Sequence, residues 1–157
     1  MFLLFNRYLQ KNGLRFLSFS LLGQILELSL ASLALDHRDG ITSVCKFIIE
    51  LIDAGKKPNA PQIVRDQVEQ LLTGRMGNDD CYGQKLVNTL MNCSLVTLPS
   101  FYIPDMADIL WSLLNWDKTR AFQWLEKTLQ AVSIHLHPTT PESAPQSLQE
   151  FYETIKK

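Results

Sequence analysis

Apolar residues recur at helical spacing along almost the whole chain, and no stretch sustains the strict alternation of a β-strand. Such stripes lie in residues 41–52, 64–72 and 86–95, and the clearest one lies in residues 106–114. The stripe of residues 41–52 consists of Ile41, Val44, Cys45, Ile48, Leu51 and Ile52. This periodicity predicts an all-α fold without a sheet.

The helices are predicted to come in pairs. The first helix of each pair is expected to begin near residues 14, 60 and 104, which gives a period of about 45 residues, close to that of HEAT and armadillo repeats. Residues 1–133 are therefore predicted to form a HEAT-repeat α-solenoid segment of about three antiparallel helix pairs, with a core between neighbouring repeats. Residues 134–157 are rich in proline, threonine and serine and predict an irregular segment that can end in a short helix.

Four polar residues, Asp36, His37, Arg38 and Asp39, interrupt the apolar pattern between two predicted helices. The cluster could be a catalytic or metal site, or the turn between two packed helices. Consecutive residues at a helix junction point in different directions, whereas a metal site needs ligands that converge on one point. The turn is the preferred interpretation, with Asp39 as the N-cap of the next helix and Asp117 as a second N-cap.

Cysteine and histidine spacing does not predict a metal centre. Cys45, Cys81 and Cys93 contain no CxxC pair and are expected to be buried free thiols in a reducing compartment. His135 and His137 form an H-x-H pair, but no third ligand is evident. No phosphate-binding glycine loop, nucleophile elbow or HExxH motif occurs. We therefore expect no enzyme activity, no catalytic residue, no metal and no cofactor.

The three tryptophans, Trp111, Trp116 and Trp124, could form an aromatic platform. At helical spacing, however, Trp111 and Trp124 are predicted to pack between helices. The platform is therefore the less favoured interpretation.

Residues 16–35 form an apolar run nearly long enough to span a bilayer, and the bases before it also resemble the start of a signal sequence. Glu27 near its middle would cost about 2.5–3.5 kcal/mol on insertion scales, so a membrane segment is not favoured. The alternative stays open that the chain is a free-standing helical protein, tethered to a membrane through residues 16–35.

The charge distribution does not favour a nucleic-acid partner. The chain carries 15 basic and 16 acidic residues, a net charge of −1, and the bases are not concentrated in one stretch. A nucleic-acid-binding protein normally shows a positive stripe. We expect no nucleic-acid partner.

Two longer motifs resemble a known family. "LDHRDGITSVCKFIIELI" is similar to the family pattern L-D-H-R-D-x-x-x-S-V-x-x-F-x-x-x-L-I, and "LPSFYIPDMADILWSLLNWDKTRAFQWLEKTL" is similar to a second one that contains a P-D-x-A-x-x-L-W core. Between them, Gln84, Leu86, Val87, Leu90 and Cys93 also match. Over residues 30–130, the chain resembles the C-terminal part of the transportin-SR family of nuclear import receptors, in the importin-beta superfamily, with importin-thirteen-like receptors as near relatives.

The resemblance implies a superhelix of HEAT repeats that carries serine/arginine-rich splicing factors and other protein cargo between cytoplasm and nucleus. It implies release by Ran-GTP through N-terminal repeats that have no counterpart here. It identifies no cargo-binding residue. Residues 1–20 fit the family pattern poorly, and the chain is expected to be a fragment, an isoform or a truncated gene model. An exposed stacking face is then expected, lined by Leu22, Ile25 and Leu26.

Overall fold

The computed structural model describes residues 1–35, 37–75 and 80–136. In these ranges it contains seven α-helices, a π-helical turn (Cys93–Thr97) and a 3-10 turn (Ser100–Tyr102). The helices are α1 (Phe2–Leu17), α2 (Leu22–Leu33), α3 (Arg38–Ala54), α4 (Gln62–Thr73), α5 (Tyr82–Asn92), α6 (Ile103–Trp116) and α7 (Lys118–Leu136). No strand is present in the described part beyond one isolated bridge between Arg75 and Cys81. The predicted all-α class is confirmed.

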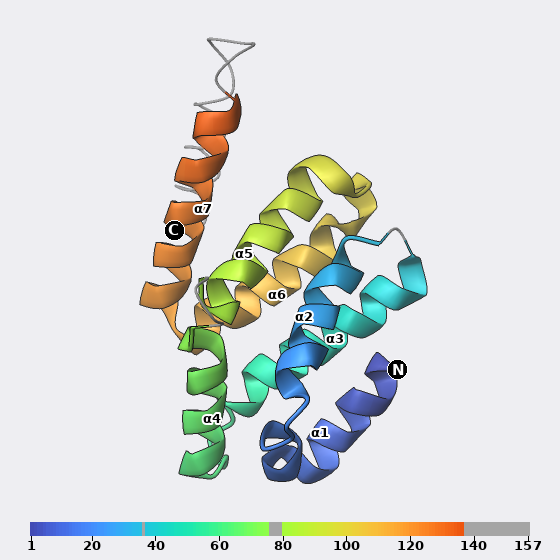
Figure 1. The fold of residues 1–157 in the computed structure, drawn as a ribbon, viewed down its shortest axis with the longest axis vertical. Coiled ribbons are helices and arrows are strands. Elements are labelled where there is room, and N and C mark those ends of the chain that lie inside the picture. Colours follow the sequence, from blue (N-terminus) through green and yellow to red (C-terminus); the bar gives the residue numbers. More distant parts are fainter. Residues whose placement is uncertain (36, 76–79, 137–157) are drawn as a thin grey trace.

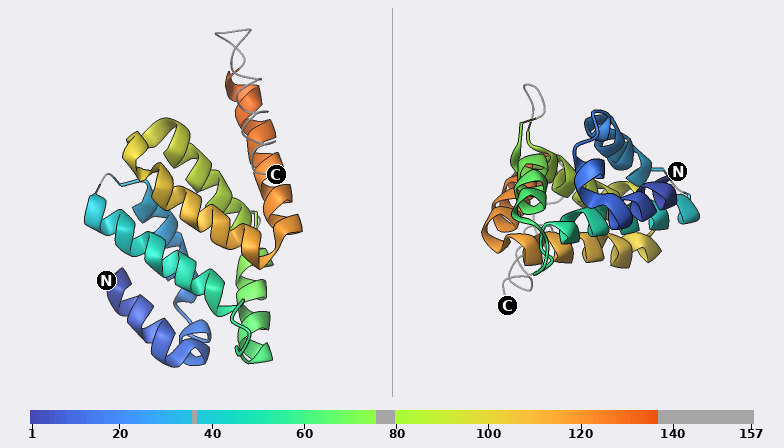
Figure 2. Two further views of the ribbon diagram at one scale, coloured as in Figure 1. Left: turned by 180° about the vertical axis from the view of Figure 1, so that it is seen from behind. Right: turned by 90° about the horizontal axis from the view of Figure 1, so that it is seen from below.

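The helices are arranged in two layers. In one layer α3 packs against both α1 and α6, and in the other α5 packs against both α2 and α7. Figure 1 shows α3 and α6 side by side and running in the same direction, whereas α2 and α5 run the opposite way. α4 contacts α1, α3 and α5 and crosses these helices at one end (Figures 1 and 2). The core therefore lies between the layers, with α3 at its centre.

The arrangement differs from three sequential helix pairs. α1 has no place among the predicted pairs, and α4 lies across the helix ends instead of in either layer. The predicted helix starts near residues 60 and 104 agree with Gln62 and Ile103, but the start near residue 14 is wrong, because α2 begins at Leu22. Local periodicity located the helices from α3 onward, but it missed α1 and could not predict which helices pack together.

Most predicted apolar stripes point into the core. All six stripe residues of α3 are buried, as are Met106, Ile109 and Leu113 of α6. Leu95 is an exception, since 52% of its surface is exposed. It lies in the π-helical turn after α5, where the wider turn ends the α-helical register.

Residues 1–20 belong to the fold, although they fit the family pattern poorly. Phe2, Phe5 and Phe16 of α1 surround Phe47 of α3, with ring centroids 5.7 Å, 6.1 Å and 5.9 Å from the Phe47 ring. Phe47 has no exposed surface. This aromatic cluster attaches α1 to the layer of α3 and α6.

The apolar run of residues 16–35 does not form one helix. α1 ends at Leu17 and α2 begins at Leu22. Among the residues that the structure describes, no helix is both long and apolar enough to cross a bilayer.

The C-terminal boundary lies slightly beyond the predicted one. α7 continues to Leu136, three residues past residue 133. The rest of the predicted irregular segment, including His137 and the short helix expected at residues 148–157, lies outside the described residues.

Candidate functional site

The Asp-His-Arg-Asp stretch lies at the turn between α2 and α3. His37 is the N-cap of α3, and its Nδ1 accepts a hydrogen bond of 3.1 Å from the backbone N–H of Gly40. The prediction that Asp39 is the N-cap is therefore wrong. Asp39 is a first-turn residue whose backbone carbonyl accepts a hydrogen bond from the Ser43 hydroxyl. Arg38 is exposed, and Asp36 lies outside the described residues. The cluster thus contains one capping side chain and no converging set of ligands among its described members.

The corrected cap gives a testable difference. Replacing His37 with alanine removes the acceptor for an orphan N–H and should lower the free energy of unfolding by about 0.5–1 kcal/mol. Replacing Asp39 with alanine should change it by less than about 0.5 kcal/mol, as is usual for surface substitutions. Urea denaturation of both variants checks this. A larger loss for Asp39→Ala than for His37→Ala would contradict the assignment.

The second predicted cap is confirmed. The Asp117 carboxylate accepts a hydrogen bond of 3.1 Å from the backbone N–H of Arg120 in the first turn of α7. It also lies 3.5 Å from the Arg120 guanidinium, which pairs with Glu69 of α4 at 2.7 Å. These contacts fix the sharp turn between α6 and α7.

Buried polar contacts join neighbouring helices of the same layer. Ser29 of α2 and Tyr82 of α5 share a hydrogen bond of 3.0 Å, and Ser112 of α6 donates one of 2.7 Å to Asp53 of α3. Burial raises the pKa of Tyr82, so its hydroxyl stays protonated and can donate. Because each contact joins neighbours in one layer, these bonds help to set the register of the stack.

Gln84 makes a comparable contact between α5 and α7. Its Nε2 donates to the Trp124 carbonyl at 3.0 Å and to Thr128 Oγ1 at 2.9 Å. Gln84 is among the residues that match the family pattern, and the structure gives it a packing role.

The cysteines are free thiols, as predicted. Cys45 and Cys93 are buried, whereas Cys81, which was also predicted to be buried, is only half-buried. Burial, with the nearby carboxylates of Asp105 and Asp108, raises the pKa of Cys45 to about 12. Burial also raises the pKa of Cys93. Both thiols are therefore protonated at neutral pH and poorly suited to act as nucleophiles or metal ligands. Among the described residues, no three potential ligands form a metal-binding group.

The tryptophans do not all pack as predicted. Trp116 and Trp124 are stacked, with ring centroids 6.2 Å apart and planes 12° apart. Trp111 was predicted to lie between helices, but 66% of its surface is exposed. It projects from α6, the last helix of its layer among the described residues, where no neighbouring helix covers it.

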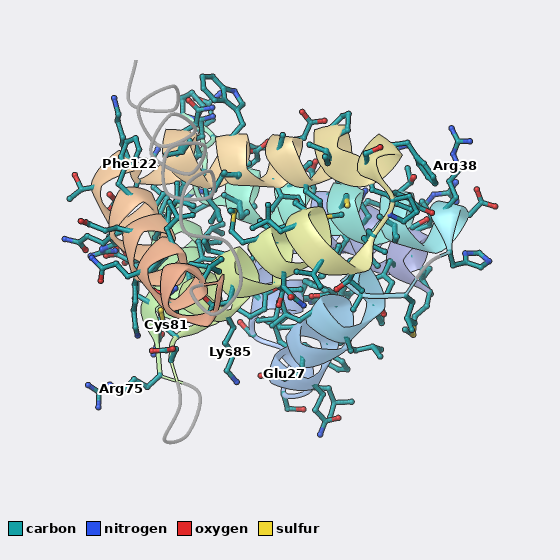
Figure 3. All side chains as sticks on the ribbon, turned by 90° about the horizontal axis from the view of Figure 1, so that it is seen from above. Glu27, Arg38, Arg75, Cys81, Lys85 and Phe122 are labelled. Atoms are coloured by element: carbon teal, nitrogen blue, oxygen red, sulfur yellow. The ribbon has the colours of Figure 1, made fainter. Side chains whose placement is uncertain are left out.

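An open pocket of about 680 Å³ lies between the end of α4, the start of α5 and α7. Its lining includes Arg75 and Cys81, labelled in Figure 3, and the ion pair between Asp80 and Lys127. The lining residues that the structure describes include no histidine that could act as a base beside Cys81. The described lining therefore contains no cysteine–histidine pair.

The clearest candidate for an interaction surface is the N-terminal edge, which we define as the exposed sides of α1 and α2 with the turns that flank them. Of the 15 large apolar residues that are exposed in the described part of the chain, nine lie in residues 1–35. These are Met1, Leu3, Leu4, Tyr8, Leu14, Phe19, Leu21, Leu28 and Leu35. Exposed apolar side chains gathered in one region are typical of interaction sites.

The residues predicted to line an exposed stacking face are not the exposed ones. Leu22, Ile25 and Leu26 were expected to be exposed, yet each has at most 7% of its surface exposed. They face α3 and α5, whereas Leu21 and Leu28 lie on the outer side of α2. A nearly uniform apolar run does not reveal which of its sides is covered.

No protein-family model matches this sequence.

Proposed function

We propose that this chain is the C-terminal segment of a nuclear import receptor of the importin-beta superfamily, and that it acts as a scaffold and protein-binding surface. It is a HEAT-repeat α-solenoid segment that works between cytoplasm and nucleus and catalyses no reaction. Its cargo is protein, with serine/arginine-rich splicing factors as the favoured class.

The observation that carries this proposal is the layered stack with an uncovered apolar edge. Helices of one layer run in the same direction, and the two layers run in opposite directions, which supports a repeating solenoid unit. A solenoid exposes apolar surface wherever a neighbouring repeat is missing. The concentration of exposed apolar residues in residues 1–35 is what a segment of a longer stack would show.

α4 lies outside the helix pairs that would form the repeats. The pairs α2–α3 and α5–α6 make equivalent contacts, since α2 packs on α5 and α3 packs on α6. α1 and α7 extend the two layers at their ends. α4 is then a helical connection between two repeats, and this explains why a simple period of about 45 residues does not describe the packing.

Binding of cargo and of Ran-GTP tests the proposed function. A fluorescently labelled serine/arginine-rich domain should bind the chain saturably but weakly, with a dissociation constant of about 10 μM or more, because a solenoid spreads cargo contacts over many repeats. Ran-GTP should not bind detectably, since the family's Ran site lies in repeats that this sequence does not match.

Fluorescence anisotropy measures both interactions. A lysine-rich peptide of the same length and charge serves as the control and should bind more weakly than the cargo domain. Saturable Ran-GTP binding would contradict the proposal, and so would a cargo domain that binds no better than the control peptide.

A further inference from the structure

α1 carries basic side chains that pair with no acidic residue in the described part of the chain. Arg7, Lys11 and Arg15 are exposed and belong to none of the ion pairs among the described residues. The first acidic residue of the chain is Glu27, and its carboxylate already lies 3.0 Å from the Lys85 ammonium (Figure 3). The N-terminal edge is therefore both apolar and positively charged.

The apolar and basic residues share one side of α1. We define the α1 outer face as the exposed residues Leu3, Leu4, Arg7, Tyr8 and Lys11. They follow i, i+4 and i+3 spacing in the part of the helix before the break at Asn12, where φ is −140° and ψ is 53°. The opposite side of the same segment is buried on α3 and α4, so it cannot also contact a partner.

We propose that the α1 outer face binds an acidic amphipathic helix, which extends the layer of α1, α3 and α6. Apolar side chains of that helix would pack on Leu4 and Tyr8, while its carboxylates would pair with Arg7 and Lys11. This inference rests on the proposed function, in which a neighbouring helical repeat covers the N-terminal edge. It specifies the chemistry of the helix that would contact α1.

Charge and shape favour an acidic helix over the other occupants. A second copy of the chain would bring the same three positive charges against this face, and like charges across an interface oppose association. A bilayer surface would attract the bases, but stable membrane binding by an interfacial helix needs a broad apolar face. The broad apolar side of α1 is already buried in the protein, and only Leu3, Leu4 and Tyr8 remain on the outer face.

Two matched peptides test the proposal. One is a capped 18-residue helical peptide, a length of about five turns, with a leucine stripe flanked by glutamates, and the other has lysines in place of the glutamates. At low salt the glutamate peptide should bind the chain at least tenfold more tightly than the lysine peptide, and added NaCl should reduce this ratio.

Charge-reversal variants locate the effect. The double variant Arg7→Glu/Lys11→Glu should reverse the preference between the two peptides. Arg75→Glu, an exposed base between α4 and α5, is the matched control and should retain it. Circular dichroism of each variant checks that the helices are intact.

The relative binding of the two peptides decides whether the proposal holds. Equal binding of the two peptides, binding of neither, or a preference that survives Arg7→Glu/Lys11→Glu would overturn the proposal. A membrane surface would be the better occupant if the chain sedimented with phosphatidylserine vesicles, the Arg7→Glu/Lys11→Glu variant did not, and the chain bound the two peptides equally. That result would also overturn the proposal. The cargo assay and the peptide assay use different ligands and are scored separately, so a failure of one leaves the result of the other intact.

Discussion

Replacing Phe47 with alanine is expected to lower the free energy of unfolding by about 3–5 kcal/mol, the usual cost of deleting a buried phenylalanine ring. Phe47 is fully buried and lies within 6.1 Å, between ring centroids, of Phe2, Phe5 and Phe16. Loss of the ring opens a cavity between α1 and α3 and removes the contact that attaches α1. Urea denaturation measures the loss of stability, and hydrogen exchange of the α1 amides should become faster than that of the α6 amides.

Phe101→Ala is the matched control, since 59% of the Phe101 surface is exposed. Its cost should be below about 1 kcal/mol. If the two variants lost similar stability, or if α1 exchanged at the same rate in wild type and Phe47→Ala, the role of residues 1–20 in the fold would be wrong.

The substitution Gly83→Ala should be destabilising by about 1–3 kcal/mol, although alanine is normally the better helix former. A Cβ at residue 83 would lie 2.7 Å from Trp124 Cζ2 and closer still to two other atoms of that ring. The indole would have to move, and with it the stack on Trp116 and the α5–α7 contact. Near-ultraviolet circular dichroism should detect the movement of the tryptophan. Urea denaturation should measure the loss in the free energy of unfolding.

Gly23→Ala in α2 provides the control, because a Cβ there would have no atom within 4 Å. This variant should be stabilised by about 0.4–1 kcal/mol through the lower entropy of the unfolded chain. If Gly83→Ala were also stabilised, the close packing of Trp124 on α5 would be contradicted.

The positions of the helices from α3 onward could be predicted from the sequence, because apolar spacing is a local property. The stripe of residues 41–52 and the cap at Asp117 are both as expected. The N-cap of α3 was predicted wrongly. Aspartate is a common N-cap residue, which favoured Asp39, but the helix begins at Arg38 and makes His37 the cap. A shift of two residues is within the usual uncertainty of a predicted helix end.

Packing between helices could not be predicted in the same way. The contacts of α3 with both α1 and α6 join residues far apart in the sequence, and no local pattern specifies them. For the same reason, the exposed edge was assigned to Leu22, Ile25 and Leu26 instead of Leu21 and Leu28. Trp111 was likewise placed between helices, because helical spacing does not show where a layer ends.

Sedimentation velocity tests the central claim, that the chain is a helical stack with an uncovered N-terminal edge. If this edge is uncovered, the sedimentation coefficient should rise with protein concentration. It should rise more steeply at high salt, where repulsion between the basic edges is screened. The variant Leu4→Ser/Leu28→Ser should reduce this self-association without loss of helix content. A chain that stays monomeric at every concentration and salt level, or that associates equally in the double variant, would contradict the account.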